Sequence, residues 1–191
     1  MYIVMLVGGM GFILLAKEKS DLELIKAATL DHMTNIYNRG TFIRHAREAI
    51  SLHVRKRTPI SLLLMDLDNF KKVNDTYGHH TGDIVLTRFA EDIKKQLRSY
   101  DLFGRFGGEE FVLLLPETDE NAAAEVAERL RKHIEENPVP LSNGIFYTIS
   151  IGAVSMIPDS NTSVEDLFNQ CDQALYLAKG KGRNRVEFYK T

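Results

Sequence analysis

The stretch Arg105-Phe106-Gly107-Gly108-Glu109-Glu110-Phe111, followed by the apolar run at residues 112–115 (VLLL), decides how this chain is organised. Apolar or aromatic residues on both sides of a glycine pair predict two strands joined by a tight hairpin, because glycine accepts a positive φ at both central turn positions. Two adjacent carboxylates lie at the exit of this turn. A solvated turn without a further role would show the same Gly-Gly-Glu-Glu, and for these four residues alone that interpretation is favoured.

A second acidic segment follows another apolar strand. Residues 60–65 form an uninterrupted apolar run that ends in Asp66-Leu67-Asp68. Because such runs are usually buried on both faces, we expect a central strand beside the one that begins at Phe111, which brings Asp66 near Glu109. Carboxylates gathered at strand ends need a positive partner, and Mg²⁺ or Mn²⁺ holding a phosphorylated substrate suits oxygen ligands. Asp68 has the alternative of an N-cap, and both roles can hold: Asp68 as cap and Asp66 as ligand.

Together these motifs resemble the GGDEF family of diguanylate cyclases. The resemblance extends from about Asp31 to Val186 and is carried by the GGEEF turn at 107–111, residues 66–79 (DLDNFKKVNDTYGH), Gly82-Asp83, and residues 174–186 (ALYLAKGKGRNRV). It implies a palm-like fold of the nucleotide cyclase and polymerase type. The pattern of the chain agrees, since strands that alternate with amphipathic helices predict an α/β sandwich with helices packed over a mixed sheet and a central β-hairpin.

The resemblance implies a role for each matching residue. Asp66, Glu109 and the Leu67 carbonyl are the implied metal ligands, for two Mg²⁺ or Mn²⁺ ions in each half-site. Glu109 is the candidate proton acceptor and Glu110 the second choice. The other implied residues serve GTP: Lys71 on the transferring phosphate, Lys179 and Arg183 on the terminal phosphates, Asn74 and Asp83 on the base, with Phe70, His79, Gly107 and Gly108 also in the substrate site.

Base choice is assigned to Asn74 and Asp83 on chemical grounds as well. Guanine presents N1–H and a 2-amino group, and an aspartate carboxylate can accept from both, whereas adenine offers neither donor at these positions. A site built on such hydrogen bonds rejects the wrong base by about 10⁴-fold or more, because its polar groups would be left unpaired. The alternative for Asp83 is a helix N-terminal cap.

A further motif, Arg98-Ser99-Tyr100-Asp101, ends just before the hairpin. Its spacing to Gly107 matches the family's inhibitory product site, Arg-x-x-Asp, and Arg129 matches the family's second arginine. Arginine can pair with the O6 and N7 edge of guanine, and aspartate with guanine's N–H donors, so the pair suits cyclic di-GMP. The alternative is a local surface ion pair, worth about 0–1 kcal/mol.

Composition narrows the class of protein. The 191 residues carry a net charge of −2, which gives no electrostatic case for nucleic-acid binding. The single cysteine, Cys171, excludes an internal disulfide and fits a reducing compartment, where helix packing is its expected role. One later helix is expected to bury Ala122, Val126 and Leu130 as its apolar stripe.

The N-terminus predicts a membrane anchor. Residues 1–16 are almost wholly apolar and precede Lys17 and Lys19, so we expect a short or truncated transmembrane segment, although a buried core helix is the alternative. The lysines place the rest of the chain in the cytoplasm, at the inner (cytoplasmic) membrane. Residues 17–30 then form a connecting signalling helix and residues 31–191 the GGDEF domain. The family implies a homodimer.

The resulting functional hypothesis is signal transduction by a membrane-bound transferase. The domain is expected to condense two GTP molecules into cyclic di-GMP and two pyrophosphates, with product feedback inhibition. Two alternatives stay open. One is a catalytically inactive module that binds GTP or cyclic di-GMP as an effector, and the other is a membrane-anchored interaction domain.

Overall fold

The computed structural model describes residues 17, 19, 23–140 and 144–190. Residues 23–29 are helical, and the helices and strands after them run in the order α2 (Arg39–Lys56), β1 (Ile60–Leu67), α3 (Phe70–Tyr77), α4 (His79–Lys95), β2 (Leu102–Gly107), β3 (Glu110–Pro116), α5 (Glu120–Glu136), β4 (Ile149–Met156), α6 (Val164–Gly180) and β5 (Val186–Phe188). In this described part, no helix has both the length and the apolar character to cross a membrane. The predicted membrane segment, residues 1–16, lies outside it.

The strands form one mixed sheet in the order β2-β3-β1-β4-β5. All pairs are antiparallel except β4 and β5, which run parallel. Every residue of β1 is buried, as expected for an apolar strand with a neighbour on each side. The predicted α/β sandwich with a central hairpin is therefore confirmed, and so is the pairing of β1 with the strand that contains Phe111.

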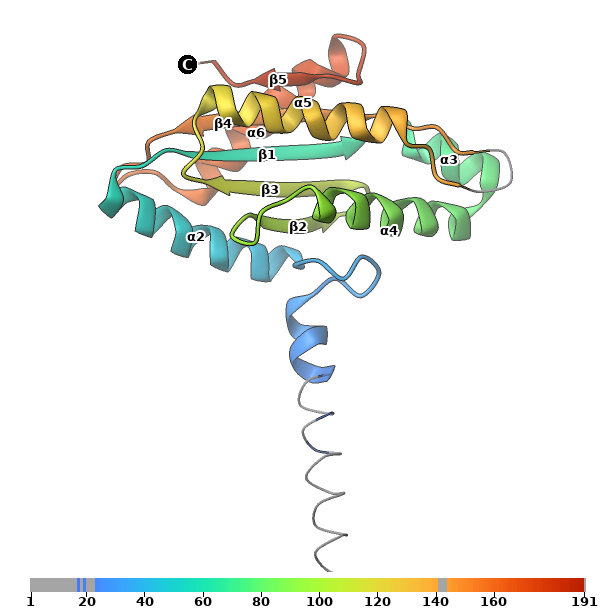
Figure 1. Ribbon diagram of the computed structural model, residues 1–191, viewed down its shortest axis with the longest axis horizontal. Helices are drawn as coiled ribbons and strands as arrows, with labels where there is room; N and C mark the ends of the chain where they lie inside the picture. Colours follow the sequence, from blue (N-terminus) through green and yellow to red (C-terminus); the bar gives the residue numbers. More distant parts are fainter. Residues whose placement is uncertain (1–16, 18, 20–22, 141–143, 191) are drawn as a thin grey trace, which may run out of the picture.

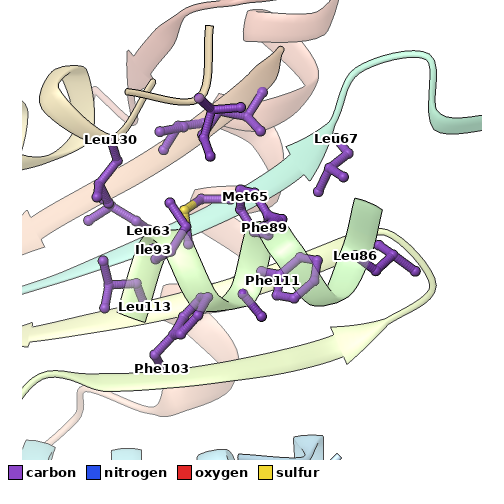
Figure 2. Packing of buried hydrophobic residues seen from close by; sticks show 14 of the residues in the cluster. Leu63, Met65, Leu67, Leu86, Phe89, Ile93, Phe103, Phe111, Leu113 and Leu130 are labelled. Atoms are coloured by element: carbon purple, nitrogen blue, oxygen red, sulfur yellow. The ribbon is translucent and has the colours of Figure 1, made fainter. Parts of the chain in front are cut away.

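Helices cover both faces of the sheet, and successive residues of β1 alternate between them. On one face, Leu63, Met65 and Leu67 pack in a cluster with α4 and α5; Figure 2 shows Phe89 and Ile93 of α4 in this cluster. On the other face, Leu62 and Leu64 join a second cluster with α2 and α6. Figure 1 shows the sheet between these two layers. The even-numbered residues of β1 therefore face α6, which decides where Asp66 points.

The predicted turn of the hairpin is wrong by one residue. Gly107 pairs with Glu110, so the two central turn residues are Gly108 and Glu109 rather than the two glycines. Gly108 alone has a positive φ, 52°, which matches a hairpin turn that needs glycine only at its first central position. A register shift between Arg105 and Gly107 accompanies the turn. Glu109 therefore lies within the turn, and Glu110 begins β3.

The predicted stripe on α5 is also displaced. Ala122 is exposed and Val126 is only partly buried, whereas Ala123, Ala127, Leu130 and Ile134 are the fully buried residues. Asp119 explains the shift, because its side chain accepts a hydrogen bond from the backbone N–H of Ala122 and so fixes the start of the helix. Cys171 is buried, as predicted.

A glycine sets the distance between β4 and α6. A Cβ added to Gly152 would lie 2.2 Å from the carbonyl oxygen of Cys171 and 2.3 Å from the backbone nitrogen of Leu175. Both atoms belong to the backbone of α6, which cannot rotate away as a side chain could. The close approach is therefore possible only without a side chain at this position.

Candidate active site

Three carboxylates meet where β1 ends and β3 begins. Asp66 and Glu110 are directly opposite each other in the sheet register, and both belong to the set of alternate residues that faces α6. Glu109 is next to them in the turn. Burial is the first cause that raises the pKa of each of the three, and the charge of Asp66 raises the pKa of Glu109 and of Glu110 further. The cluster thus has an excess of negative charge.

Lys179, in the last turn of α6, partly compensates this cluster. Its Nζ lies 2.8 Å from Asp66 Oδ2, and Asp66 is only 5% exposed. Two arginines lie farther away but act on the same group of carboxylates: the charge of Arg183 lowers the pKa of Asp66, and that of Arg39 lowers the pKa of Glu110. Neither shift overcomes the effect of burial. A phosphorylated ligand would therefore need additional positive charge here.

Asp68 is not the predicted N-cap. Asn69 occupies the cap position of α3, with a left-handed φ of 57° and no capping hydrogen bond from its side chain. Asp68 is instead 4% exposed and accepts hydrogen bonds from Thr148 Oγ1 at 2.7 Å and Ser150 Oγ at 2.6 Å. It also accepts from the backbone N–H of Asn184 at 3.0 Å. These donors lie 80 to 116 residues away in the sequence, so local spacing gives no sign of them.

Sequence reasoning also missed Arg105. Its Nε and Nη2 donate to the carbonyl oxygen of Gly108 at 3.0 and 2.7 Å, which holds the turn from outside. Its Nη1 donates to Asp31 Oδ1 at 3.1 Å. Although burial alone would raise the pKa of Asp31, hydrogen bonds from Thr34 and Arg105 hold it below its ordinary value. The sequence signal that could have identified this arginine is its position three residues before Gly108.

The residues predicted to read the base lie side by side. A Cβ added to Gly82 would be 1.9 Å from Asn74 Oδ1, so the side chain of Asn74 on α3 rests against α4 next to Asp83. Asp83 is exposed and is the fifth residue of α4, which begins at His79. The N-cap alternative for Asp83 is therefore wrong, because the cap position is Gly78.

The remaining predicted substrate residues surround this edge of the sheet. Lys71 and His79 are exposed, in the first turns of α3 and α4. Phe70 is 6% exposed and its side chain belongs to the core, so only its backbone is available to a nucleotide. Gly107 and Gly108 are exposed in the hairpin, and a Cβ added to either would meet no atom within 4 Å.

A cavity of about 470 Å³ lies beside the Arg-x-x-Asp motif. Arg98, Asp101, Lys26 and Tyr37 are among its lining residues. The predicted ion pair alternative is wrong, because Asp101 Oδ2 accepts from the backbone N–H of Arg98 at 2.8 Å and the two side chains form no ion pair within the described chain. Burial raises the pKa of Asp101, and its Oδ1 is buried with no hydrogen-bond partner among the residues that the structure describes.

Arg129 lies on the exposed side of α5. Its Nη2 donates to the carbonyl oxygen of Gln96 at 3.4 Å, and its charge lowers the pKa of Asp101. The structure therefore brings Arg129 into the electrostatic neighbourhood of the motif, as its predicted role requires, although it lines a separate hollow with Gln96 and Glu128.

The residues at the acidic cluster suit a hard metal ion. In the part of the chain that the structure describes, no group of three or more His, Cys, Asp and Glu side chains is arranged to hold a metal ion. The predicted set does not require one, since it consists of two carboxylates and the Leu67 carbonyl. Oxygen donors of this kind suit Mg²⁺ or Mn²⁺, which usually take their remaining ligands from water and substrate phosphates.

Comparisons with known proteins agree with this geometry. Residues 28–185 match the family model described as diguanylate cyclase, GGDEF domain. The chain is 38% identical over 163 residues to diguanylate cyclase DosC of Escherichia coli K12. The aligned region covers 84% of this chain and 35% of DosC. It is 40% identical over 172 residues to diguanylate cyclase A of Treponema denticola. Here the aligned region covers 88% of this chain and 46% of the relative. The chain thus spans less than half the length of these curated relatives.

Solved structures show the same fold. The coiled coil and GGDEF domain of DgcB from Caulobacter crescentus, in complex with c-di-GMP, superposes with a TM-score of 0.83 at 29% identity and covers 93% of this chain and 95% of that one. The active GGEEF domain of a diguanylate cyclase from Vibrio cholerae gives a TM-score of 0.76 at 34% identity, with 81% and 97% covered.

Proposed function

This chain belongs to the GGDEF family of diguanylate cyclases, and from that premise we propose that it condenses two GTP molecules into cyclic di-GMP with release of two pyrophosphates. The observation that carries the proposal is the meeting of the buried Asp66 with the half-buried Glu109 and Glu110, with Lys179 paired to Asp66 at 2.8 Å. Carboxylates with raised pKa values next to one lysine have the charge pattern of a site that gathers cations and phosphates. An interaction domain has no need of such a group.

Asp66, Glu109 and the Leu67 carbonyl would hold Mg²⁺ or Mn²⁺, two ions in each half-site. When bound, the ions neutralise phosphate charge and lower the pKa of the attacking 3′-hydroxyl. The residues themselves supply the rest. Glu109 would accept the proton of that hydroxyl, with Glu110 as the second choice. Lys71 would stabilise the transferring phosphate, while Lys179 and Arg183 hold the terminal phosphates that leave as pyrophosphate.

One domain offers one such site, whereas the product joins two nucleotides, so two copies must face each other about a two-fold axis. The proposal therefore includes a homodimer. It also includes anchoring in the cytoplasmic membrane through residues 1–16, with the domain in the cytoplasm, because confinement to a surface raises the effective concentration of one domain for another. The support for the anchor is the apolar composition of that segment and the lysines that follow it.

Turnover per molecule should rise with protein concentration. We expect the full chain, incubated with GTP and Mg²⁺ in mild detergent, to form cyclic di-GMP, because assembly of two copies completes the site. Chromatography of the nucleotides measures product, and light scattering at each concentration reports the oligomeric state. Constant specific activity down to a proven monomer would contradict the dimer, and GTP binding without product would favour the inactive effector module instead.

Asp83→Ala should lose discrimination between bases. In the parent, the carboxylate accepts from guanine N1–H and the 2-amino group, so we expect a preference for GTP over ATP of about 10⁴-fold or more and a fall of about 10²-fold or more in the variant. The measurement is kcat/KM for both nucleotides. Asp75→Ala is the matched control, since it removes an exposed aspartate of α3 with no predicted role. An unchanged preference in Asp83→Ala would remove this residue from the base site.

Arg98→Ala should keep turnover and lose product inhibition. We include feedback inhibition in the proposal because Asp101 Oδ1 is a buried acceptor without a partner in the described part of the chain. The cavity beside it is lined by Lys26, Lys94 and Arg98, whose positive charges suit the phosphates of the product. Initial rates with and without added cyclic di-GMP measure the effect, and Asp101→Ala should behave alike. Bound product would hold the domains where their GTP sites cannot meet, which predicts non-competitive inhibition. Equal inhibition of Arg98→Ala and the parent would refute the assignment.

A further inference from the structure

The connection between α6 and β5 has an unusual backbone. Gly182, Arg183 and Asn184 all have positive φ values, of 112°, 64° and 47°. Glycine adopts this conformation freely, whereas a side chain such as that of arginine disfavours it. Such a conformation persists only where the surrounding structure holds it, and it is frequent at functional sites. The middle residue of the three is Arg183, to which the proposed function assigns the terminal phosphates of GTP.

Asp68 holds the turn from the side of the sheet. The hydroxyls of Thr148 and Ser150 donate to its carboxylate, so the side chain is fixed at the point where β1 ends and β4 begins. The backbone N–H of Asn184 donates to the same carboxylate at 3.0 Å. Asp68 is almost fully buried, and these contacts leave it no room to reach a nucleotide.

Asn184 holds the turn from the side of α5. Its Oδ1 accepts from Arg131 Nη1 at 2.6 Å, and its Nδ2 donates to Glu135 Oε1 at 2.7 Å. Arg131 is itself fixed by ion pairs of 2.8 Å to Glu128 and to Glu135. The side-chain oxygen and nitrogen of Asn184 are therefore both hydrogen-bonded within the protein.

Arg183 itself is left available. Its backbone N–H donates to the carbonyl oxygen of Ala178 at 3.0 Å, which fixes its main chain to the end of α6. Its side chain is exposed and makes no ion pair among the described residues. Its charge nevertheless lowers the pKa of Asp66 in the acidic cluster, although burial raises that pKa more.

We propose that Asp68 and Asn184 are positioning residues, which hold the left-handed turn that presents Arg183 to the terminal phosphates of GTP. The proposal rests on the proposed function, because it takes Arg183 to bind the terminal phosphates of GTP. Asp68 and Asn184 themselves touch no substrate. It also accounts for a buried carboxylate that neither the metal site nor a helix cap uses.

A double-mutant cycle on the full chain tests the proposal. Asn184→Gly keeps a residue that accepts positive φ and removes only the side-chain hydrogen bonds, so we expect KM for GTP to rise about 10-fold with little change in kcat. Arg183→Ala should raise KM at least as much. In the Arg183→Ala background, Asn184→Gly should then add less than about twofold, because the arginine it positions is gone. Additive losses would overturn the proposal.

Binding of nucleotides separates positioning from general damage to the site. In Asn184→Gly, affinity for GTP should fall about 10-fold while affinity for GMP, which lacks the terminal phosphates, stays unchanged. An equal fall for both would overturn the proposal. These affinities are measurable without turnover, so a parent that binds GTP but forms no product would refute the proposed function and leave this test intact.

A rescue and a control complete the design. Asn184→Asp places two carboxylates together and should weaken GTP binding, whereas Asn184→Asp combined with Glu135→Gln restores one donor and one acceptor and should recover it. Failure of the pair to recover GTP binding, with the fold intact by thermal unfolding, would count against the proposal. Arg57→Gly is the matched control, because Arg57 is exposed at the end of α2 and also has a positive φ, 55°. It should leave KM unchanged.

Discussion

Asp66→Asn is expected to reduce formation of cyclic di-GMP by at least about 10²–10³-fold without lowering the stability of the fold. The loss of activity follows from the removal of a charged oxygen at the centre of the acidic cluster. The unchanged stability of the fold follows from the raised pKa of Asp66. Burial raises the pKa of Asp66 above its ordinary value of 3.8, so the folded chain holds this proton more tightly than the unfolded chain. Deprotonation at neutral pH therefore costs folding free energy, and asparagine removes that cost.

The pH dependence provides the check. Stability that Asp66 contributes in its protonated form is fully present below pH 3.8 and is lost as pH rises through the raised pKa, so the Tm of metal-free Asp66→Asn should equal or exceed that of the parent at pH 7. The difference should shrink as the pH is lowered. Asp75→Asn, on the exposed side of α3, should change neither activity nor Tm. A large fall in the Tm of Asp66→Asn at pH 7 would show that its bond to Lys179 outweighs burial.

Gly152→Ala is expected to destabilise the fold by about 3 kcal/mol, at the upper end of the usual cost of overpacking. The added methyl group would collide with backbone atoms of Cys171 and Leu175 at 2.2 and 2.3 Å, so α6 must move away from β4. That movement opens the core cluster on this face and shifts Lys179 at the end of the same helix. For a chain of this size, we expect Tm to fall by roughly 6–12 °C.

Gly40→Ala is the matched control for this collision. Gly40 lies in the first turn of α2, where an added Cβ would approach only Asn38 Oδ1, at 3.7 Å. It should be neutral or stabilise the fold by up to about 1 kcal/mol, since alanine favours the helix more than glycine. Thermal unfolding of both variants gives the comparison, and equal midpoints would contradict the close packing of α6 on β4.

The sequence alone predicts those parts of the fold that depend on local pattern. The uninterrupted apolar run before Asp66 correctly indicates a buried central strand, because this signal lies within a few consecutive residues. The turn and α5 were each misplaced by one residue. Their exact phase depends on Gly107 pairing with Glu110 and on the cap at Asp119, and several neighbouring positions would satisfy the same apolar pattern.

The candidate site shows a similar division. The motifs predict that Asp66, Glu109 and Glu110 lie close together, and the structure has them at one edge of the sheet. Spacing does not reveal the task of Asp68, because its donors come from β4 and from the turn after α6. Nor does it reveal Arg105, whose partner Asp31 is 74 residues away. Residues that bind substrate recur in short motifs, whereas residues that position them depend on the folded chain.

The hydrogen bonds that Arg105 donates to Asp31 and to Gly108 have a consequence for how the N-terminal segment acts on the hairpin. They join the segment that follows helix 23–29 to the hairpin turn through polar contacts, at distances of 3.1 and 2.7 Å, by way of a side chain of β2. We expect a change in the direction of that helix to reach the turn through these contacts. The boundary after helix 23–29 is therefore the point at which a displacement of the N-terminal segment would act on the hairpin.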